Sequence, residues 1–218
     1  MAKKVNTTKC KIIDVALKLF GCKGYDGTSV RDIAKEADVN LASVNYHFNN
    51  KQNLYLEVFI NNHALVEEDL NNLYQDGMNL EQFSVAMFEY FIANSNNLLN
   101  TFRMILNESI DFSCDSNTVS SKELGPPASN ILLKLITEEV GEDVPLDGRF
   151  WAVSTLIAKI THMAIILSSS IIRERCSNLS HLNKSTQSRN IRLQCKSVLS
   201  FLRSEPHSTW DPDFKIDI

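Results

Sequence analysis

Apolar residues recur at helical spacing along most of the chain, and the strict apolar and polar alternation of half-buried strands is hard to find. Gly and Pro, which punctuate strand-rich folds, number only seven and five in 218 residues. This length is enough for one large domain or for a small module joined to a larger one. The pattern therefore predicts an all-α protein.

The first predicted helix lies in the stretch TKCKIIDVALKLFGCKGY. Ile13, Ala16, Leu17 and Phe20 share one face of it, with charged residues on the other side. Gly24 follows as a plausible left-handed stop. This amphipathic pattern predicts a short helix that packs on something small.

A second short helix is predicted over residues 30–37. Ser29 is a good N-cap, and Asp32 places an acid three residues later, which approximates a capping box. The apolar residues of the helix form a buried stripe, which consists of Val30, Ile33, Ala34 and Ala37.

A tight turn separates this helix from a third one, predicted over residues 41–48. Asp38 adopts a left-handed backbone more easily than most residues, and Asn40 can cap the third helix. Val44 and Phe48, one turn apart, form its inner face. Polar side chains are left to point elsewhere, namely Ser43, Asn45 and Tyr46 or His47.

Two short helices joined by a tight turn are typical of a helix-turn-helix whose second helix enters the DNA major groove. Asn and Ser can bind base edges or phosphates, and Tyr and His can reach phosphates or stack. The alternative is a helical hairpin with an ordinary polar surface. The pattern alone leaves both open.

The rest of the chain predicts a long helix from residue 53 to about residue 73 and five further helices. Those five cover residues 80–93, 98–110, 128–140, 150–172 and 190–202, with polar connections at 111–129 and 173–190. The longest apolar run, residues 150–167, is interrupted by Lys159 and His162, which favours a buried helix over a membrane span.

Charge is divided unevenly along the chain. Residues 1 to 55 contain nine Lys or Arg and five Asp or Glu, which gives +4, whereas thirteen basic and twenty-one acidic residues give −8 over the remainder. A basic end on an acidic body indicates a polyanion partner for the first module, although a solvated charged face would have the same composition.

Five cysteines without a C-x-x-C pair argue against a disulfide framework or a zinc site, and nothing marks one of them as a redox sensor. The basic N-terminus is followed by an amphipathic segment rather than by the apolar core of a secretory signal. We therefore expect a cytoplasmic protein without metal or cofactor. The enzyme class is disfavoured because H-E-x-x-H, G-x-S-x-G and phosphate-binding Gly loops are all missing from the sequence.

The stretch LKLFGCKGYDGTSVRDIAKEADVNLASVNYHFNNKQNLYLEVF closely resembles the N-terminal domain of TetR-type transcriptional regulators. The resemblance rests on F-x-x-x-G-Y, T-[ST]-V-R-D-I-A, the turn, Y-H-F and K-x-x-L, in that order and spacing. It covers roughly residues 9–59.

The resemblance implies a homodimeric repressor that binds a palindromic double-stranded DNA operator and responds to a small-molecule effector. It implies a three-helix DNA-binding domain at residues 6–52, with the motif at about 29–48. A helical ligand-binding and dimerisation domain would follow at residues 53–205, with a C-terminal tail at 206–218. The last two long helices of each subunit would form a four-helix dimer interface.

Carried over by position, the resemblance assigns phosphate contacts to Thr28, Tyr46 and Lys51. It assigns positions facing the groove to Arg31, Leu41, Ala42, Ser43, Asn45 and His47. Arg31 could read a guanine edge or touch a phosphate, and the alternative is a surface Arg paired with a neighbouring acid.

The sequence departs from the family pattern at two positions. Asp38 stands where the turn commonly carries Gly, which brings an anion near DNA, and Asn45 replaces a frequent aromatic residue. Both bear on the operator sequence, and Asp38 keeps open the alternative of a helical dimeric module that has lost its DNA affinity.

A ligand pocket is predicted from apolar side chains of the larger domain, with His162 as the polar anchor. The alternative for each is an ordinary core position. The candidate pocket residues are Phe91, Phe102, Met104, Phe112, Trp151, His162 and Met163.

Overall fold

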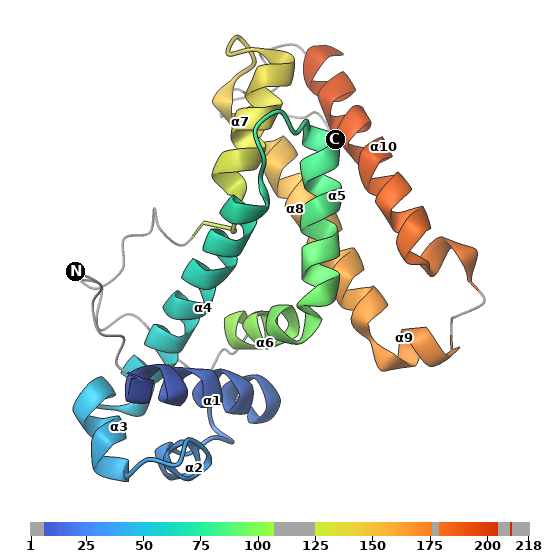
Figure 1. The fold of residues 1–218 in the computed structure, drawn as a ribbon. Coiled ribbons are helices and arrows are strands. Elements are labelled where there is room, and N and C mark those ends of the chain that lie inside the picture. Colours follow the sequence, from blue (N-terminus) through green and yellow to red (C-terminus); the bar gives the residue numbers. More distant parts are fainter. Residues whose placement is uncertain (1–6, 107–124, 176–178, 205–209, 211–218) are drawn as a thin grey trace, which may run out of the picture. The chain divides into compact units, whose positions relative to one another are not determined.

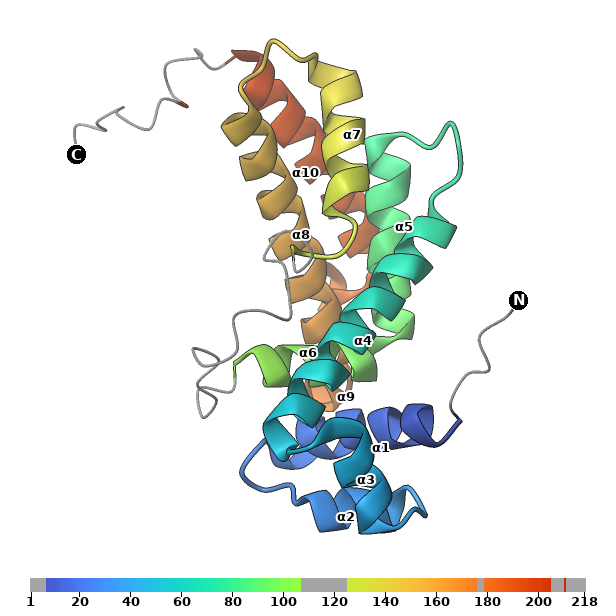
Figure 2. The ribbon, with the colours of Figure 1, turned by 90° about the vertical axis from the view of Figure 1, so that its left-hand side faces the viewer.

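The structure is a computed structural model that describes residues 7–106, 125–175, 179–204 and 210. Within these ranges every regular element is a helix, which confirms the all-α prediction (Figures 1 and 2). The chain packs as two compact units. The first unit comprises residues 1–67 and 96–125, and the second unit comprises residues 68–95 and 126–218.

The first unit contains three short N-terminal helices, most of a long fourth helix and a further helix from later in the chain. These are α1 (Thr7–Lys23), α2 (Val30–Glu36), α3 (Leu41–Phe48), α4 (Lys51–Leu73, of which residues 68–73 belong to the second unit) and α6 (Ser95–Ile105, from residue 96). All five contribute to one apolar core, whose buried members include Ile12, Phe20, Ile33, Val44, Phe48, Leu54, Val58 and Met104.

Packing in the first unit continues past residue 52. Leu54, Tyr55 and Val58 of α4 are buried in the core, and the Tyr55 hydroxyl donates to the Met104 carbonyl oxygen at 2.9 Å. The helix-turn-helix therefore needs α4 and α6 to close its core. The division into domains at residues 6–52, 53–205 and 206–218 stays a prediction, since compact packing does not by itself delimit function.

The second unit is a bundle in which α5 is the most completely buried helix. It contains α5 (Leu80–Ala93), α7 (Ser129–Val140), α8 (Leu146–Ser168), α9 (Ser170–Arg175), the 3₁₀ helix η2 (Ser180–Leu182) and α10 (Lys184–Ser204). The α5 helix packs against α7, α8 and α10. Its apolar residues occur on more than one face because it has neighbours on several sides; they are Leu80, Phe83, Met87, Phe88 and Phe91.

The single helix predicted over residues 150–172 is wrong. The helix α8 begins earlier, at Leu146, and ends at Ser168; Ser169 is extended, with ψ of 127°, and α9 follows. The Ser168 hydroxyl donates to the Ala164 carbonyl oxygen at 2.6 Å. Serine side chains compete in this way for backbone groups, and three of them in a row favour a helix end.

The connection predicted over residues 173–190 is also wrong in part, because α10 begins at Lys184. The side-chain oxygen of Asn183 accepts from the Thr186 N–H at 2.7 Å, which is the geometry of a helix cap. Residues 184–190 carry too few apolar side chains to reveal a helix, so this cap was missed. The expected end of the 98–110 helix, and most of the 111–129 connection, lie outside the described residues.

By length and composition α8 could cross a membrane, since its most apolar 18-residue stretch has a mean hydropathy of 1.6. In the structure 33% of that stretch is buried. A core helix of a globular protein passes the same test. Here α8 packs against α5, α7 and α10, and its buried face includes Ala152, Leu156, Ile160 and Ala164. This packing agrees with the prediction of a core helix.

Candidate nucleic-acid interface

The α2 helix starts at a complete capping box. The Ser29 hydroxyl oxygen accepts from the Asp32 N–H at 3.0 Å, while the Asp32 carboxylate accepts from the Ser29 N–H at 3.2 Å and from its hydroxyl at 2.6 Å. These hydrogen bonds to the charged carboxylate lower the pKa of Asp32. The cap fixes where α2 begins and confirms the predicted start.

The turn between α2 and α3 depends on Asp38, whose φ is 51°. This left-handed backbone lets the Val39 N–H donate to the Ala34 carbonyl oxygen at 3.0 Å, which closes the end of α2. The Asn40 side-chain oxygen then accepts from the Ser43 N–H at 2.6 Å and from the Ser43 hydroxyl at 2.8 Å. Both the left-handed turn and the Asn40 cap are confirmed.

The inner face of α3 anchors it to the core of the first unit. Val44 and Phe48 are 1% and 2% exposed, as predicted. With the cap at one end and these two side chains below, α3 has one fixed orientation on α2. Its opposite face is therefore presented as a rigid surface.

The outer face of α3 carries the residues expected to meet the groove. Tyr46 is 83% exposed and Leu41 is 37% exposed. Ala42 and Asn45 are also exposed, while Ser43 and His47 are half-buried. Because the Ser43 hydroxyl donates to Asn40, it is left to act as an acceptor.

Lys51 is the first residue of α4 and is held by an aromatic ring. Its ammonium nitrogen lies 4.0 Å from the centroid of the Tyr25 ring, a cation–π geometry. The helix start is capped by the Asn50 side-chain oxygen, which accepts from the Asn53 N–H at 2.8 Å. A helix N-terminus together with a fixed ammonium is a favourable position for a phosphate.

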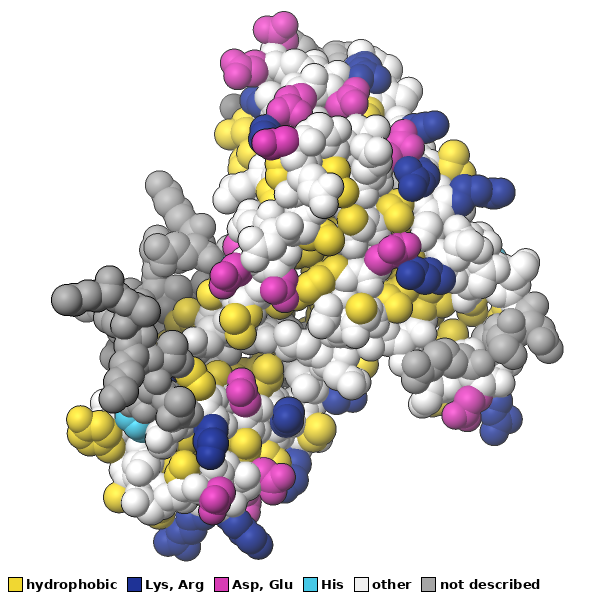
Figure 3. Space-filling model, viewed as in Figure 1, with side chains coloured by type: hydrophobic (Ala, Val, Ile, Leu, Met, Phe, Trp, Pro, Cys, Tyr) yellow, Lys and Arg dark blue, Asp and Glu magenta, His cyan; other side chains and the backbone are white. Residues whose placement is uncertain are grey.

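Arg31 lies exposed on α2, and among the described residues it forms no ion pair. The alternative of a surface Arg neutralised by an acid therefore finds no support in the described part of the chain. Figure 3 shows Lys and Arg side chains along the lower edge of the first unit, where α2 lies in Figure 1, with Asp or Glu side chains just above them. Such a basic edge suits a polyanion.

The structure places Thr28 differently from the expected phosphate contact. Its side chain is 1% exposed, and its hydroxyl donates to the carbonyl oxygens of Gly24, at 2.8 Å, and Leu19, at 3.1 Å. The Thr28 N–H also donates to Tyr25, at 3.2 Å. Thr28 therefore ties the connection before α2 to the end of α1, and neither its hydroxyl nor its N–H is available to DNA in this conformation.

One participant was missed from the sequence. The sequence motif alone gives Tyr25 no role of its own, yet its ring supports Lys51 and contacts Phe20 and Tyr55 at centroid distances of 6.1 and 5.2 Å. Burial, and secondarily Asp26, raise the pKa of Tyr25, so it stays neutral. Residues 25 and 51 are too far apart in the chain for any helical periodicity to pair them.

The described candidates for the ligand pocket are divided between the two units. Phe102 and Met104 belong to the first unit, where Met104 is part of the core. The second unit holds Phe91, Trp151, His162 and Met163. His162, the expected polar anchor, is exposed, and Trp151 packs on Phe201 at a centroid distance of 5.0 Å. Phe91 and Met163 are buried, and Phe112 lies outside the described residues. A ligand pocket shared by these residues therefore stays a prediction.

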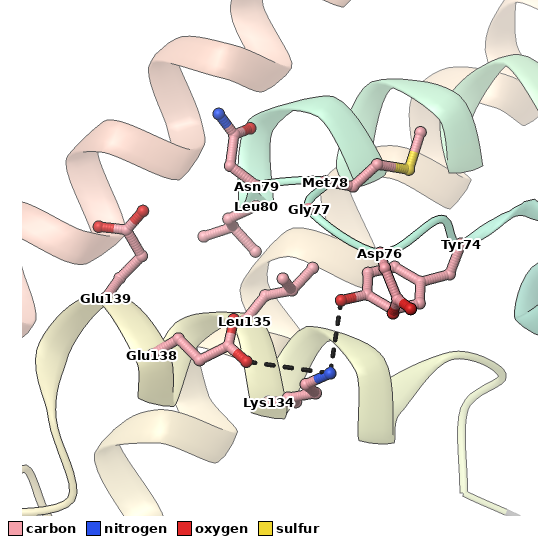
Figure 4. Close-up of a pocket in the computed structure, with 10 residues that line it drawn as sticks. All are labelled: Tyr74, Asp76, Gly77, Met78, Asn79, Leu80, Lys134, Leu135, Glu138 and Glu139. Carbon is pink, nitrogen blue, oxygen red and sulfur yellow. Dashed lines mark hydrogen bonds and ion pairs between the residues drawn. The ribbon is translucent and has the colours of Figure 1, made fainter.

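A hollow of about 350 Å³ does occur in the second unit, between the α4–α5 connection and α7 (Figure 4). None of the predicted pocket residues lines it. The Lys134 ammonium lies 3.4 Å from the Tyr74 hydroxyl and 3.9 Å from the Glu138 carboxylate. Hydrogen bonding to Tyr74 contributes most to the raised pKa of Lys134. The Lys134 ammonium, the one cation among the lining residues, is thus already partnered.

Sequence comparison places the chain among DNA-binding regulators. The family model described as "Bacterial regulatory proteins, tetR family" matches residues 12–58. The negative transcriptional regulator of the biofilm operon icaADBC, IcaR, from Staphylococcus aureus is 31% identical over 144 residues, which are 60% of this chain and 75% of IcaR. The probable regulator YttP of Bacillus subtilis is 56% identical over 48 residues, 22% of this chain and 23% of YttP.

Solved structures share the fold. A TetR-family regulator from a Shewanella species superimposes with a TM-score of 0.61 at 19% identity, over 86% of this chain and 97% of that one. The regulator FadR of Bacillus subtilis, solved with stearoyl-CoA, gives a TM-score of 0.58 at 18% identity, over 89% of this chain and 97% of the FadR chain. From the family match, the length shared with IcaR and the helix-turn-helix geometry, the chain belongs to the TetR family of bacterial regulatory proteins and is a DNA-binding transcriptional regulator.

Proposed function

We propose that the protein is a homodimeric repressor that binds a palindromic operator through α3 and is released by a small molecule. The observation that carries the proposal is the two-sided α3 helix: two apolar side chains fix it to the core, and the opposite face offers exposed polar side chains. That arrangement is required of a recognition helix, which must be rigidly oriented to read base edges.

On this proposal the phosphate contacts come from Lys51, Tyr46 and Arg31, and the groove contacts from the N-terminal half of α3 and His47. Phosphate contacts set affinity and register, whereas base contacts set sequence preference. Leu41 and Ala42 offer only apolar contact, such as a thymine methyl. Asn45 offers both a donor and an acceptor to a base edge.

Dimerisation through α8 and α10 is supported by apolar side chains that these helices leave exposed in the second unit. Phe150 is 45% exposed and Leu193 is 50% exposed. Large apolar side chains on one face commonly mark a protein interface. Other exposed apolar residues of the two helices are Leu146, Trp151 and Phe201. A dimer would double the short site that one recognition helix can read.

The repressor and effector parts of the proposal draw on the relatives. IcaR is a negative regulator, and FadR was solved with stearoyl-CoA. A ligand that prefers one of two conformations by a few kcal/mol is sufficient to shift the population that binds DNA. The alternative, a module that has lost DNA affinity, is opposed by the exposed Arg31 and by the ring-supported Lys51.

The proposal is tested by fluorescence anisotropy with the DNA immediately upstream of the protein's own gene, at low and moderate salt. We expect tight, salt-sensitive binding that is lost in the double variant Tyr46→Ala, Lys51→Ala. The matched control is Lys196→Ala, which also removes one positive charge but lies in the second unit; it should bind as the wild type does. If upstream DNA and a random-sequence selection both give no specific binding, the protein is a module without DNA affinity.

The dimer is tested separately by sedimentation velocity. Phe150→Asp and Leu193→Asp should each produce monomers, because a buried carboxylate opposes apolar association. Leu65→Asp is the control, since Leu65 is a leucine of α4 in the first unit that is 56% exposed. Loss of the dimer in this control, or its persistence in both test variants, would contradict an α8 and α10 interface.

A further inference from the structure

A hollow of about 710 Å³ lies between α1 and α6, wholly within the first unit. Leu17, Lys18 and Cys22 line it from α1, and Asn97, Leu99 and Arg103 line it from α6. The volume is within the range of small-molecule sites in proteins. None of the residues assigned above to DNA or to the predicted ligand pocket lines it.

Specific contacts hold the two walls in place. Gly21 of α1 lies so close to α6 that a Cβ atom there would be 2.3 Å from the Asn100 side chain. The Arg103 guanidinium donates to the Gly21 carbonyl oxygen at 3.1 Å. The Asn62 amide of α4 donates to the Thr101 hydroxyl of α6 at 2.6 Å. The helices therefore touch at the end of α1 and leave a defined hollow beside this contact.

One polar atom in the lining has no partner. The side-chain oxygen of Asn97 is buried and has no hydrogen-bond partner among the described residues. Buried acceptors of this kind are uncommon in native proteins, because desolvation without a hydrogen bond is unfavourable. Because this oxygen is not exposed to the hollow as it stands, an N–H or O–H group of a bound molecule would satisfy it once the Asn97 side chain turns toward the hollow.

The charges of the lining favour an anion. Lys18 and Arg103 form no ion pair with a described residue. Asp14, on the α1 wall, is the one carboxylate among the lining residues, so these three groups leave a net charge of +1. Leu17 and Leu99 add apolar surface between the charged groups.

We propose that this hollow is a binding site for a small organic carboxylate that also carries an N–H or O–H donor and an apolar group. The carboxylate pairs with Lys18 and Arg103, and the apolar group covers Leu17 and Leu99. The donor binds the Asn97 oxygen, whose side chain turns toward the hollow. Binding itself is independent of DNA; an influence on operator affinity rests on the proposed function, because α1 and α6 belong to the same unit as α3.

The test uses N-acetyl-L-phenylalanine as the probe and two cysteines of the full-length protein as reporters. Cys10 and Cys22 are both exposed on α1, but only Cys22 lines the hollow. Alkylation by iodoacetamide is followed at each cysteine by peptide mass spectrometry, without DNA. At about 10 mM probe, a concentration suited to millimolar fragment affinity, we expect alkylation of Cys22 to slow roughly fivefold and that of Cys10 to be unchanged.

Two controls assign the protection to the proposed groups. N-acetyl-L-phenylalaninamide has the same ring and N–H but no carboxylate, and it should not protect Cys22. Lys18→Gln should abolish protection by the carboxylate probe, where protection is the ratio of the Cys22 rates of this same variant without and with probe, because loss of the neighbouring charge also changes the rate without probe. Equal rates at Cys22 with and without probe, equal protection by the amide, or undiminished protection in Lys18→Gln would each overturn the proposal. A protein that fails to bind DNA but still shows this protection would overturn only the proposed function.

Discussion

The ammonium of Lys51 and the ring of Tyr25 are in direct contact, with the nitrogen 4.0 Å from the ring centroid. The ring is in turn fixed by an edge contact with Tyr55, at a centroid distance of 5.2 Å. A residue at the core of the first unit thus determines where the charge at the start of α4 is held. This links the packing of the aromatic cluster to the proposed phosphate contact.

Replacing Tyr25 should therefore leave the Lys51 ammonium less firmly held. In a double-mutant cycle of Tyr25→Leu with Lys51→Met, measured by urea unfolding, we expect a coupling free energy of about 0.5–1 kcal/mol, the usual size of a partly exposed cation–π contact. Tyr25→Phe keeps the ring and should retain most of the coupling. A coupling near zero in the Leu cycle would show that the contact does not stabilise the fold.

Asp38 combines a left-handed backbone with a negative charge, and the two effects can be separated. Asp38→Asn keeps a residue that tolerates φ of 51° and removes the charge, so we expect unchanged thermal stability and tighter DNA binding. Asp38→Ala removes the charge and also replaces Asp with a residue that tolerates the left-handed backbone poorly, so it should destabilise the fold by about 1 kcal/mol. Thermal unfolding and anisotropy of both variants distinguish backbone strain from charge. Weaker DNA binding by Asp38→Asn would contradict the claim that the negative charge of Asp38 opposes DNA binding.

The ends of α2 and α3 were predictable because their signals are local in the sequence. Ser29 with Asp32, and Asn40 with Ser43, make their capping contacts within three residues. The left-handed turn at Asp38 is likewise a property of one residue type. Such contacts depend little on the rest of the fold, so a single sequence reveals them.

The misplaced residues depended on tertiary contacts that sequence spacing does not encode. Thr28 is a polar residue within a polar stretch, and only its contacts with the end of α1 remove it from the surface. His162 lies on an apolar helix, yet the α8 face that carries it is exposed. For the ligand pocket, the sequence identified apolar residues but could not assign each of them to one of the two units.

The capping box predicts a dependence of stability on pH. Hydrogen bonds from Ser29 hold the pKa of Asp32 below its usual value of 3.8. A carboxylate whose pKa is lowered by folding stabilises the protein above the unfolded pKa, and this contribution is lost as pH falls through the lower folded pKa. The difference in melting temperature between wild type and Asp32→Ala should therefore be largest near neutral pH and shrink below about pH 4.

The control for this prediction is the Ser29→Ala background, which removes the hydroxyl partner of the carboxylate. There the effect of Asp32→Ala at neutral pH should be smaller and should vary less with pH. A difference between wild type and Asp32→Ala that is constant from acidic to neutral pH would contradict the role of the charged carboxylate.

Gly148 of α8 and Trp210 are packed so closely that a side chain at residue 148 has no room. A Cβ atom there would lie 2.8 Å from Cε2 and 3.0 Å from Cδ2 of the Trp210 indole. The indole also contacts Trp151 and Phe201, at centroid distances of 5.7 and 6.1 Å. Gly148→Ala must therefore displace the indole from this aromatic group or push it away from α8.

The sign of the effect should depend on Trp210. In the wild-type background we expect Gly148→Ala to destabilise the protein by about 1–3 kcal/mol through overpacking. In a Trp210→Ala background the clash is gone, and Ala is favoured over Gly in a helix by up to about 1 kcal/mol, so the same substitution should be neutral or stabilising. Urea unfolding of the wild type, of Gly148→Ala, of Trp210→Ala and of the double variant gives the double-mutant cycle. Emission of Trp210 in a Trp151→Phe background, where it is the remaining tryptophan, reports the displacement directly. Equal effects of Gly148→Ala in both backgrounds would mean that Trp210 does not rest on α8.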